Sequence, residues 1–289
     1  METIRRVAEL RARVSDWRAA GLTVGLVPTM GALHAGHLQL VRRAFEDCDR
    51  VVVSIFVNPL QFDRPGDLAS YPRDEATDRE KLVTAGVQVL YGPLVEEMYP
   101  EHFSTGVMVA ALSEGLCGAH RPGHFGGVAT VVSKLLLQCL PDRAYFGEKD
   151  FQQLRIIERV TRDLDIPATI VPVETVREPD GLAMSSRNRL LTDQQRRAAP
   201  KLFAVLTEMA AQLADGTTAA EPVLEAGRKS LSAAGFERIE YLELRDSNLL
   251  RPLERADRPS RLFAAAWLGA VRLIDNLPII DRQPEGRGD

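Results

Sequence analysis

The feature that most constrains the fold is an alternation of short apolar runs with longer amphipathic runs between residues 22 and 173. Short runs rich in Val, Ile and Leu predict buried strands of a parallel sheet at residues 22–28, 50–56, 87–92, 143–147 and 168–173. Between them, helical periodicity predicts helices at residues 37–48, 74–85, 124–140 and 150–163. This order predicts an α/β fold with a doubly wound parallel sheet, whose ligands bind beyond the carboxyl ends of the strands.

The two ends of the chain have a different pattern. Residues 1–20 predict a helix, because Ile4, Val7, Leu10, Val14 and Trp17 recur at helical spacing. Helices are also expected at residues 192–214 and 219–234, followed by short strands whose last pair turns at Gly269. We therefore expect two domains, residues 1–185 with the large sheet and a smaller α+β domain at 186–289, with 282–289 frayed.

Composition narrows the classes of partner. The chain has 289 residues, 45% of them apolar, which is enough for one large core and a smaller one. A charged amino terminus without an apolar leader, and no run of 18 uncharged apolar residues, predict neither export nor membrane binding. A net charge of -4 disfavours a nucleic-acid surface, and three widely spaced cysteines indicate neither a disulfide framework nor a metal site. We expect a cytoplasmic protein with small-molecule partners and no metal bound by its own side chains.

One stretch, VPTMGALHAGH, holds two of the five histidines, His34 and His37, directly after a predicted strand. The two imidazoles would lie one turn apart at the amino terminus of the next helix, where free N–H groups and the helix dipole favour an anion. Gly31 and Gly36 would let a base or a phosphate approach the backbone. The alternative is a glycine-rich turn with two surface histidines.

The form H-x-G-H after a strand resembles the HIGH motif of the nucleotidyltransferase superfamily, which implies a Rossmann-like sheet of that type. AMSSRN, residues 183–188, is similar to the second, phosphate-binding motif of that superfamily, without its leading lysine. NPLQF, RPGHFGGVATVVSKL, FGEKDFQQ and REPDGLAMSSRN follow in the order typical of the pantothenate synthetase family, and RLIDN near the end also fits. Residues 192–260 carry no motif of their own, so the second domain is assigned by position.

The resemblance implies ATP-dependent ligation of pantoate and β-alanine to pantothenate, with pyrophosphate and AMP released. Pantoate carboxylate would attack the α-phosphate of ATP to give pantoyl adenylate, and β-alanine would then displace AMP. Mg²⁺ would arrive with ATP, bound mainly through phosphate oxygens. The resemblance also implies a homodimer formed by the amino-terminal domain, and a carboxyl-terminal domain that acts as a lid with a hinge near residues 186–191.

The same resemblance assigns site residues. Catalytic roles fall to His34, His37, Lys149, Ser185, Ser186 and Arg187. ATP would contact these and also Met30, Gly31, Ala32, Leu33, Ala35, Gly36, Gly147, Glu148, Asp150, Val176 and Met184. Pantoate would be held by Gln61 and Gln153, against an apolar wall of Val128, Val131, Val132 and Phe146. Tyr71, Arg73, His120, Arg121 and His124 are secondary candidates for a lid or gate.

Several assignments have simpler alternatives. Asp150 could merely cap the following helix, the valine face could be ordinary core, and Arg73 and Arg121 could be ordinary solvated residues, since arginine is abundant here. For the whole chain, one alternative is another adenylate-forming transferase that charges an amino acid. A protein that binds ATP without turnover is the other, and intact phosphate-binding motifs disfavour it.

Overall fold

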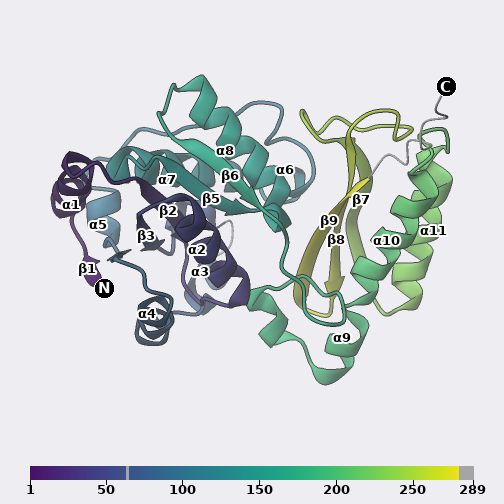
Figure 1. Cartoon of the computed structure of the whole chain (residues 1–289). Coiled ribbons are helices and arrows are strands. Elements are labelled where there is room, and N and C mark those ends of the chain that lie inside the picture. Colours follow the sequence, from purple (N-terminus) through teal and green to yellow (C-terminus); the bar gives the residue numbers. More distant parts are fainter. Residues whose placement is uncertain (63–64, 280–289) are drawn as a thin grey trace. The chain divides into compact units, whose positions relative to one another are not determined.

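Six parallel strands form the sheet in the first part of the chain, in the order β1-β4-β3-β2-β5-β6 (Figure 1). The computed structural model describes residues 1–62 and 65–279, so the predicted fraying of residues 282–289 lies outside the described residues. The strands are β1 Glu2–Ile4, β2 Val24–Thr29, β3 Arg50–Ile55, β4 Val89–Tyr91, β5 Arg143–Gly147 and β6 Thr169–Val173. The alternation of strands and helices therefore predicted β2 to β6 correctly.

The amino terminus differs from expectation. Residues 1–20 are not one helix, because Glu2–Ile4 pair with Val89–Tyr91 as strand β1 and helix α1 begins only at Val7. Ile4 shares the helical spacing of Val7 and Leu10, but it is buried by the sheet. The three-residue strand gains its stability from an existing edge, which local periodicity cannot reveal.

Helices cover both faces of this sheet. α2 (Ala35–Asp47) and α4 (Glu75–Thr84) contribute Leu40, Val41, Ala44 and Leu82 to a core with Val27, Val51 and Val53 of the strands. α7 (His124–Cys139) contacts both α1 (Val7–Ala19) and α8 (Phe151–Asp163), and all three helices contact the strands. Shorter helices are η1 Pro59–Gln61, α3 Pro65–Ser70, α5 Val95–Met98 and η2 Glu148–Asp150.

The strand order places a topological switch point between β2 and β5. From β2 the chain proceeds to β3 and β4 on one side, and it later returns to β5 and β6 on the other side. The loop with His34 follows β2, and the loop with Lys149 follows β5. Both loops therefore leave the carboxyl ends of adjacent strands, where doubly wound sheets bind their ligands.

The second unit is a three-stranded antiparallel sheet, β7 Arg238–Asp246, β8 Ser260–Leu268 and β9 Val271–Ile279 (Figure 1). The β8–β9 hairpin turns at Gly269, as predicted, with a φ of 55°. α10 (Lys201–Leu213) and α11 (Ala220–Ala233) pack their apolar faces on this sheet. The expected helix at 192–214 is interrupted before Pro200, so α9 (Asp193–Ala198) is separate; η3 (Ser186–Leu190) precedes it.

The chain divides into units at different points from the expected 185/186 boundary. One unit comprises Met1–Glu114 and Arg121–Val176, and the other comprises Gly115–His120 and the chain from Arg177 onward. The short segment Gly115–His120, with helix α6 (Cys117–His120), belongs to the second unit because Cys117 Sγ lies 3.0 Å from the Tyr241 hydroxyl. The chain thus passes between the units three times.

No helix in the described ranges is both long enough and apolar enough to cross a membrane. Cys48, Cys117 and Cys139 are all buried.

Candidate active site

The loop between β2 and α2 holds the two histidines in a defined geometry. Gly31 and Ala32 have left-handed backbone conformations, with φ values of 82° and 51°, so the chain turns sharply out of the sheet before His34. His34 then occupies the N-cap of α2. The ring centroids of His34 and His37 are 4.1 Å apart, which confirms that the two imidazoles face the same region.

Backbone hydrogen bonds orient both rings. The N–H of Gly36 donates to His34 Nδ1 at 3.1 Å, and the N–H of His34 donates to His37 Nδ1 at 3.3 Å. A backbone N–H can only donate, so each Nδ1 accepts and a neutral ring must carry its proton on Nε2. The loop therefore places two Nε2–H donors where they could donate hydrogen bonds to phosphate oxygens.

The second loop at the switch point lies close enough to influence these rings. Burial, the neighbouring His34 and the ammonium of Lys149 lower the pKa of His37 from 6.5 to about 3, while Asp150 opposes them. The Lys149 side chain is 18% exposed, and its Nζ lies 3.9 Å from Asp150 Oδ2. The structure thus brings Lys149 and Asp150 together with the histidine pair, as the sequence predicted.

Asp150 does not act as a simple helix cap. It occupies the N-cap position of α8, but its side chain makes no capping hydrogen bond to that helix, and half of the side chain is exposed. The alternative that Asp150 is only a cap is therefore wrong. Gly147 and Glu148 lead into this turn, and Gln153 lies half-buried in the first turn of α8.

Gln61 is buried and its amide is oriented by neighbours. Asn58 Nδ2 donates to Gln61 Oε1 at 3.0 Å, and Gln61 Nε2 lies 3.2 Å from Met30 Sδ, in the histidine loop. Asn58 is itself 1% exposed, and it also accepts a hydrogen bond of 2.7 Å from the Tyr99 hydroxyl. Because its oxygen is occupied, Gln61 presents its NH₂ group toward the histidine loop.

Helix α7 packs against the backbone of the Asn58–Gln61 turn. A Cβ on Gly127 would overlap the carbonyl oxygen of Leu60, so only glycine permits this contact. His124 Nδ1 lies 2.8 Å from the carbonyl oxygen of Gln61, and Arg121 Nη1 lies 3.2 Å from His124 Nε2. His124 is 8% exposed and contacts the Gln61 backbone, and its role as a gate residue stays a prediction.

The other lid or gate candidates lie at exposed or partly exposed positions. Arg73 is exposed and donates to the carbonyl oxygen of Leu68, Tyr71 stacks edge-on against Phe62, and His120 lies beside Tyr241 in the second unit. The wall residues Val128, Val131, Val132 and Phe146 are all buried, as both of their interpretations require.

The Ser185–Arg187 loop lies in the second unit and has its own framework. Ser185 caps η3 by accepting from the N–H of Arg187 at 3.3 Å, and the side chain of Arg187 is exposed. Asn188 Nδ2 donates to Glu178 Oε1 at 2.9 Å and to the carbonyl oxygen of Ala183 at 3.1 Å. Met184 and Ser186 are half-buried, as is Val176, the last residue of the first unit.

A partly buried ion pair holds the base of this loop. Arg177 forms a bidentate pair with Asp275, at 2.6 and 2.9 Å, and its guanidinium lies 3.7 Å from the ring centroid of Phe203. Asp275 belongs to the RLIDN stretch noted in the sequence. The contacts of Asn188 lie within the unit that contains residues 186–191, whereas the chain passes between the units after Glu114, His120 and Val176. A hinge near residues 186–191 stays a prediction.

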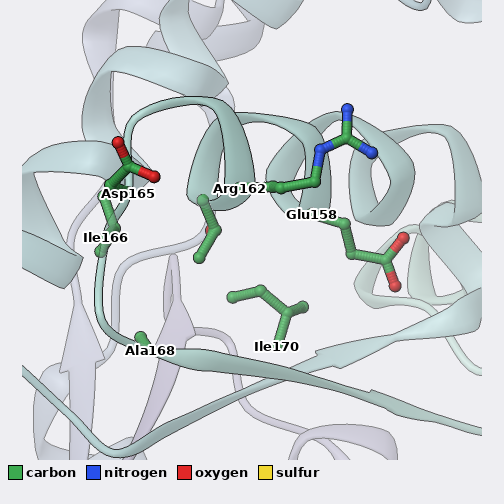
Figure 2. A pocket seen from close by; sticks show the side chains of 7 residues that line it. Glu158, Arg162, Asp165, Ile166, Ala168 and Ile170 are labelled. Carbon is green, nitrogen blue, oxygen red and sulfur yellow. The ribbon is translucent and has the colours of Figure 1, made fainter.

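A separate hollow of about 480 Å³ lies beside the edge strand β6, near the amino end of that strand (Figure 2). It is lined by the end of α8 and the start of β6, with Glu158, Arg162, Asp165 and Ile170 around it. The residues of both switch-point loops follow the opposite, carboxyl ends of β2 and β5. This hollow is therefore not part of the candidate active site.

The sheet order and the histidine pair at its switch point define an α/β protein of the nucleotidyltransferase type. The family model described as pantoate-beta-alanine ligase matches residues 2–278. The chain therefore belongs to the pantoate-β-alanine ligase family.

Similar proteins agree with this assignment. A pantothenate synthetase from Chelativorans sp. (strain BNC1) is 60% identical over 275 residues, which cover 95% of this chain and 96% of the relative. The crystal structure of pantothenate synthetase from Thermus thermophilus matches with a TM-score of 0.88 and 48% identity, over 96% of this chain and 99% of that one. A pantoate-beta-alanine ligase from Francisella tularensis, complexed with beta-gamma ATP and beta-alanine, matches with a TM-score of 0.79 and 33% identity, over 96% and 97%.

The family establishes the reaction that the sequence predicted. The protein is a ligase that forms the amide bond of pantothenate from pantoate and β-alanine, using ATP and a pantoyl adenylate intermediate. The alternatives of an amino-acid-charging enzyme and of a protein that binds ATP without turnover are thereby set aside.

Proposed function

We propose that His34, His37 and Lys149 stabilise the negative charge that develops on the α-phosphate and the leaving pyrophosphate during adenylation. The observation that carries this proposal is the orientation of the two imidazoles by backbone N–H groups at the switch point. Fixed donors require no rearrangement as the carboxylate oxygen of pantoate bonds to phosphorus and pyrophosphate leaves. Lys149 adds a positive charge beside them, and the enzyme needs no nucleophile of its own.

The Ser185–Arg187 loop supplies the remaining phosphate contacts in this proposal. Two hydroxyls and an exposed guanidinium are suitable donors for the β- and γ-phosphates. The rigid base formed by Arg177, Asn188 and Asp275 supports such a role, because it fixes the backbone and leaves Arg187 exposed. The second unit would then act as a lid that excludes water from the adenylate, as we expected of residues 186–289.

ATP would occupy the two switch-point loops. Its phosphates would meet the backbone from Gly31 to Gly36, and its ribose would meet Gly147 and Asp150, whose exposed carboxylate can accept from hydroxyl groups. The adenine would lie near Met30 and Val176. The full proposed set adds Ala32, Leu33, Ala35, Glu148 and Met184. The Francisella relative, complexed with beta-gamma ATP and beta-alanine, supports ATP and β-alanine as ligands here.

Gln61 and Gln153 would hold pantoate. The Asn58 contact leaves the NH₂ group of Gln61 as a donor, which suits the carboxylate and hydroxyl oxygens of pantoate. A donor at this position holds the carboxylate without competing for phosphorus. In the second step the amine nitrogen of β-alanine bonds to the acyl carbon, AMP departs, and the nitrogen loses a proton.

Mg²⁺, the homodimer and the cytoplasmic location are further parts of the proposal. Among the side chains that the structure describes, no group of three or more His, Cys, Asp or Glu could hold a metal. In this proposal Mg²⁺ arrives on the phosphates of ATP and is bound mainly through their oxygens. Light scattering after gel filtration should give twice the mass of one chain for a homodimer, and the mass of one chain would refute it.

Pyrophosphate exchange tests the proposed roles. Protein is incubated with ATP, Mg²⁺, pantoate and labelled pyrophosphate without β-alanine, and label should enter ATP only when pantoate is present. His37→Ala should fold normally and exchange about 10²-fold more slowly, the scale for loss of one preorganised donor. Near-normal exchange by that variant would remove His37 from the chemistry.

A further inference from the structure

Helix α4 lies far from the histidine loop in sequence but contacts it in space. Asp78, on the first turns of this helix, is 2% exposed although it carries a carboxylate. Its Oδ1 accepts from the backbone N–H of Leu33 at 2.8 Å. One turn later, Lys81 Nζ donates to the carbonyl oxygen of the same Leu33 at 2.7 Å.

Both polar groups of one residue in the loop are therefore bound by side chains of a single helix. Leu33 lies between the left-handed Ala32 and the N-cap residue His34, so its two peptide groups determine the direction in which the loop enters α2. Lys81 Nζ also lies 3.6 Å from Asp78 Oδ1, which partly compensates the buried charge. A buried carboxylate with such partners loses its compensation if the loop moves.

The loop is also shaped to admit this carboxylate. A Cβ on Gly31 would lie 3.1 Å from Asp78 Oδ2 and 3.2 Å from a methyl group of Ile55. Glycine at this position thus serves both the positive φ and the close approach of Asp78. Thr29 Oγ1 accepts from the N–H of Gly31 at 3.2 Å, so the loop is held at each side of its sharpest turn.

The geometry points to Asp78 and Lys81 as positioning residues for the histidine pair, an inference that rests on the proposed function of that pair. They hold the Leu33 peptide groups, and the fixed loop in turn places the N–H groups of His34 and Gly36 against the ring nitrogens. Neither residue touches the reacting atoms in this role. Their loss should reduce the rate of adenylation and disturb the orientation of the two rings, but leave the pantoate contacts of Gln61 in place.

Three variants and one control of the full-length protein test this inference. Asp78→Ala removes the acceptor, Asp78→Asn keeps an oxygen for Leu33 but loses the charge, and Lys81→Met removes the donor to Leu33. Glu80→Ala is the control, because Glu80 is an exposed acid on the same helix. The first readout is the imidazole ¹⁵N spectrum of ligand-free protein, and the second is kcat and the KM for pantoate in pyrophosphate exchange.

In the wild type and the control, His34 and His37 should give ring signals of the Nε2–H form. In Asp78→Ala and Lys81→Met these signals should shift, with kcat lower by up to about 10²-fold, the loss expected when reacting groups are displaced by about 1 Å. The KM for pantoate should remain unchanged, and Asp78→Asn should retain more activity than Asp78→Ala.

The inference would be overturned if Asp78→Ala folds and keeps the wild-type ring signals and kcat. If Asp78→Ala does not fold, the inference would be overturned by a Lys81→Met variant whose ring signals and kcat are those of the wild type. Failure of the proposed function has a different signature. In that case the wild type itself shows no exchange that depends on pantoate, while the ring spectra still report whether α4 positions the loop.

Discussion

The imidazole of His37 should remain neutral at acidic pH, and this property can be measured directly. Its pKa is lowered from 6.5 to about 3, mainly by burial and then by His34 and Lys149. At pH 5 about 1% of such rings carry a second proton, compared with about 97% of rings at the ordinary pKa. The ring ¹⁵N signals of His37, assigned by their loss in His37→Gln, should therefore not titrate between pH 7.5 and 5.

The lowered pKa also links stability to pH with a definite sign. Between about pH 6.5 and 3 the unfolded state binds a proton at His37 and the folded state does not, so the free energy of unfolding falls as the pH falls. The contribution of the neutral ring is complete above pH 6.5. At pH 5, about 1.5 pH units below the ordinary pKa, the loss amounts to about 2 kcal/mol, at 1.36 kcal/mol for each unit.

Denaturant unfolding of the wild type and of His37→Gln at pH 7.5 and pH 5 isolates this contribution. Glutamine cannot ionise in this range, so the difference between the two proteins should change by about 2 kcal/mol between the two pH values. Equal pH dependence in both proteins, or a His37 ring that titrates near pH 6.5, would refute the argument that burial and neighbouring cations keep this donor neutral.

Other predictions follow from individual contacts. Gln61→Ala should chiefly raise the KM for pantoate, and an unchanged KM would assign pantoate to another pocket. Gly127→Ala should destabilise the protein by about 1–3 kcal/mol, because its new methyl group overlaps the carbonyl oxygen of Leu60; wild-type thermal stability would contradict that contact. Asp275→Ala removes the carboxylate partner of the partly buried Arg177 and should cost about 3–5 kcal/mol in urea unfolding, whereas a loss below about 1 kcal/mol would mean that solvent already screens the pair.

The sequence predicted most of the large sheet because its central strands are buried on both faces. β3 and β5 are flanked by other strands and covered by helices, so each appears as a continuous apolar run. β1 has only three residues and lies at an edge, so its pattern merged with that of α1. Strands stabilised by a neighbour rather than by their own composition are invisible to local patterns.

The sequence indicated the candidate site residues that lie in unusual local stretches. It did not indicate residues whose role depends on contacts between distant parts of the chain. His34, His37 and Lys149 stand out locally, and the adjacent strands β2 and β5 bring them together. Asp78 lies in an acidic, polar helix that indicates a solvated surface, yet it contacts Leu33, 45 positions away. Such a contact depends on how α4 packs, which no spacing within that helix encodes.

The importance of Asn58 could be predicted only in part from the sequence. It belongs to the NPLQF stretch that indicated the family, but its role depends on the Tyr99 hydroxyl and the carbonyl oxygen of Gly127. The motif could therefore indicate Gln61 as a candidate pantoate contact, whereas the orientation of the Gln61 amide required the surrounding structure.

The central claim is that the histidine pair and the Ser185–Arg187 loop bind the same triphosphate. A crystal structure of this protein with a non-hydrolysable ATP analogue tests it most directly. We expect phosphate oxygens within hydrogen-bonding distance of His37 Nε2 and of the Arg187 guanidinium in a single bound nucleotide. A nucleotide whose phosphates contact only one of these clusters would contradict the account.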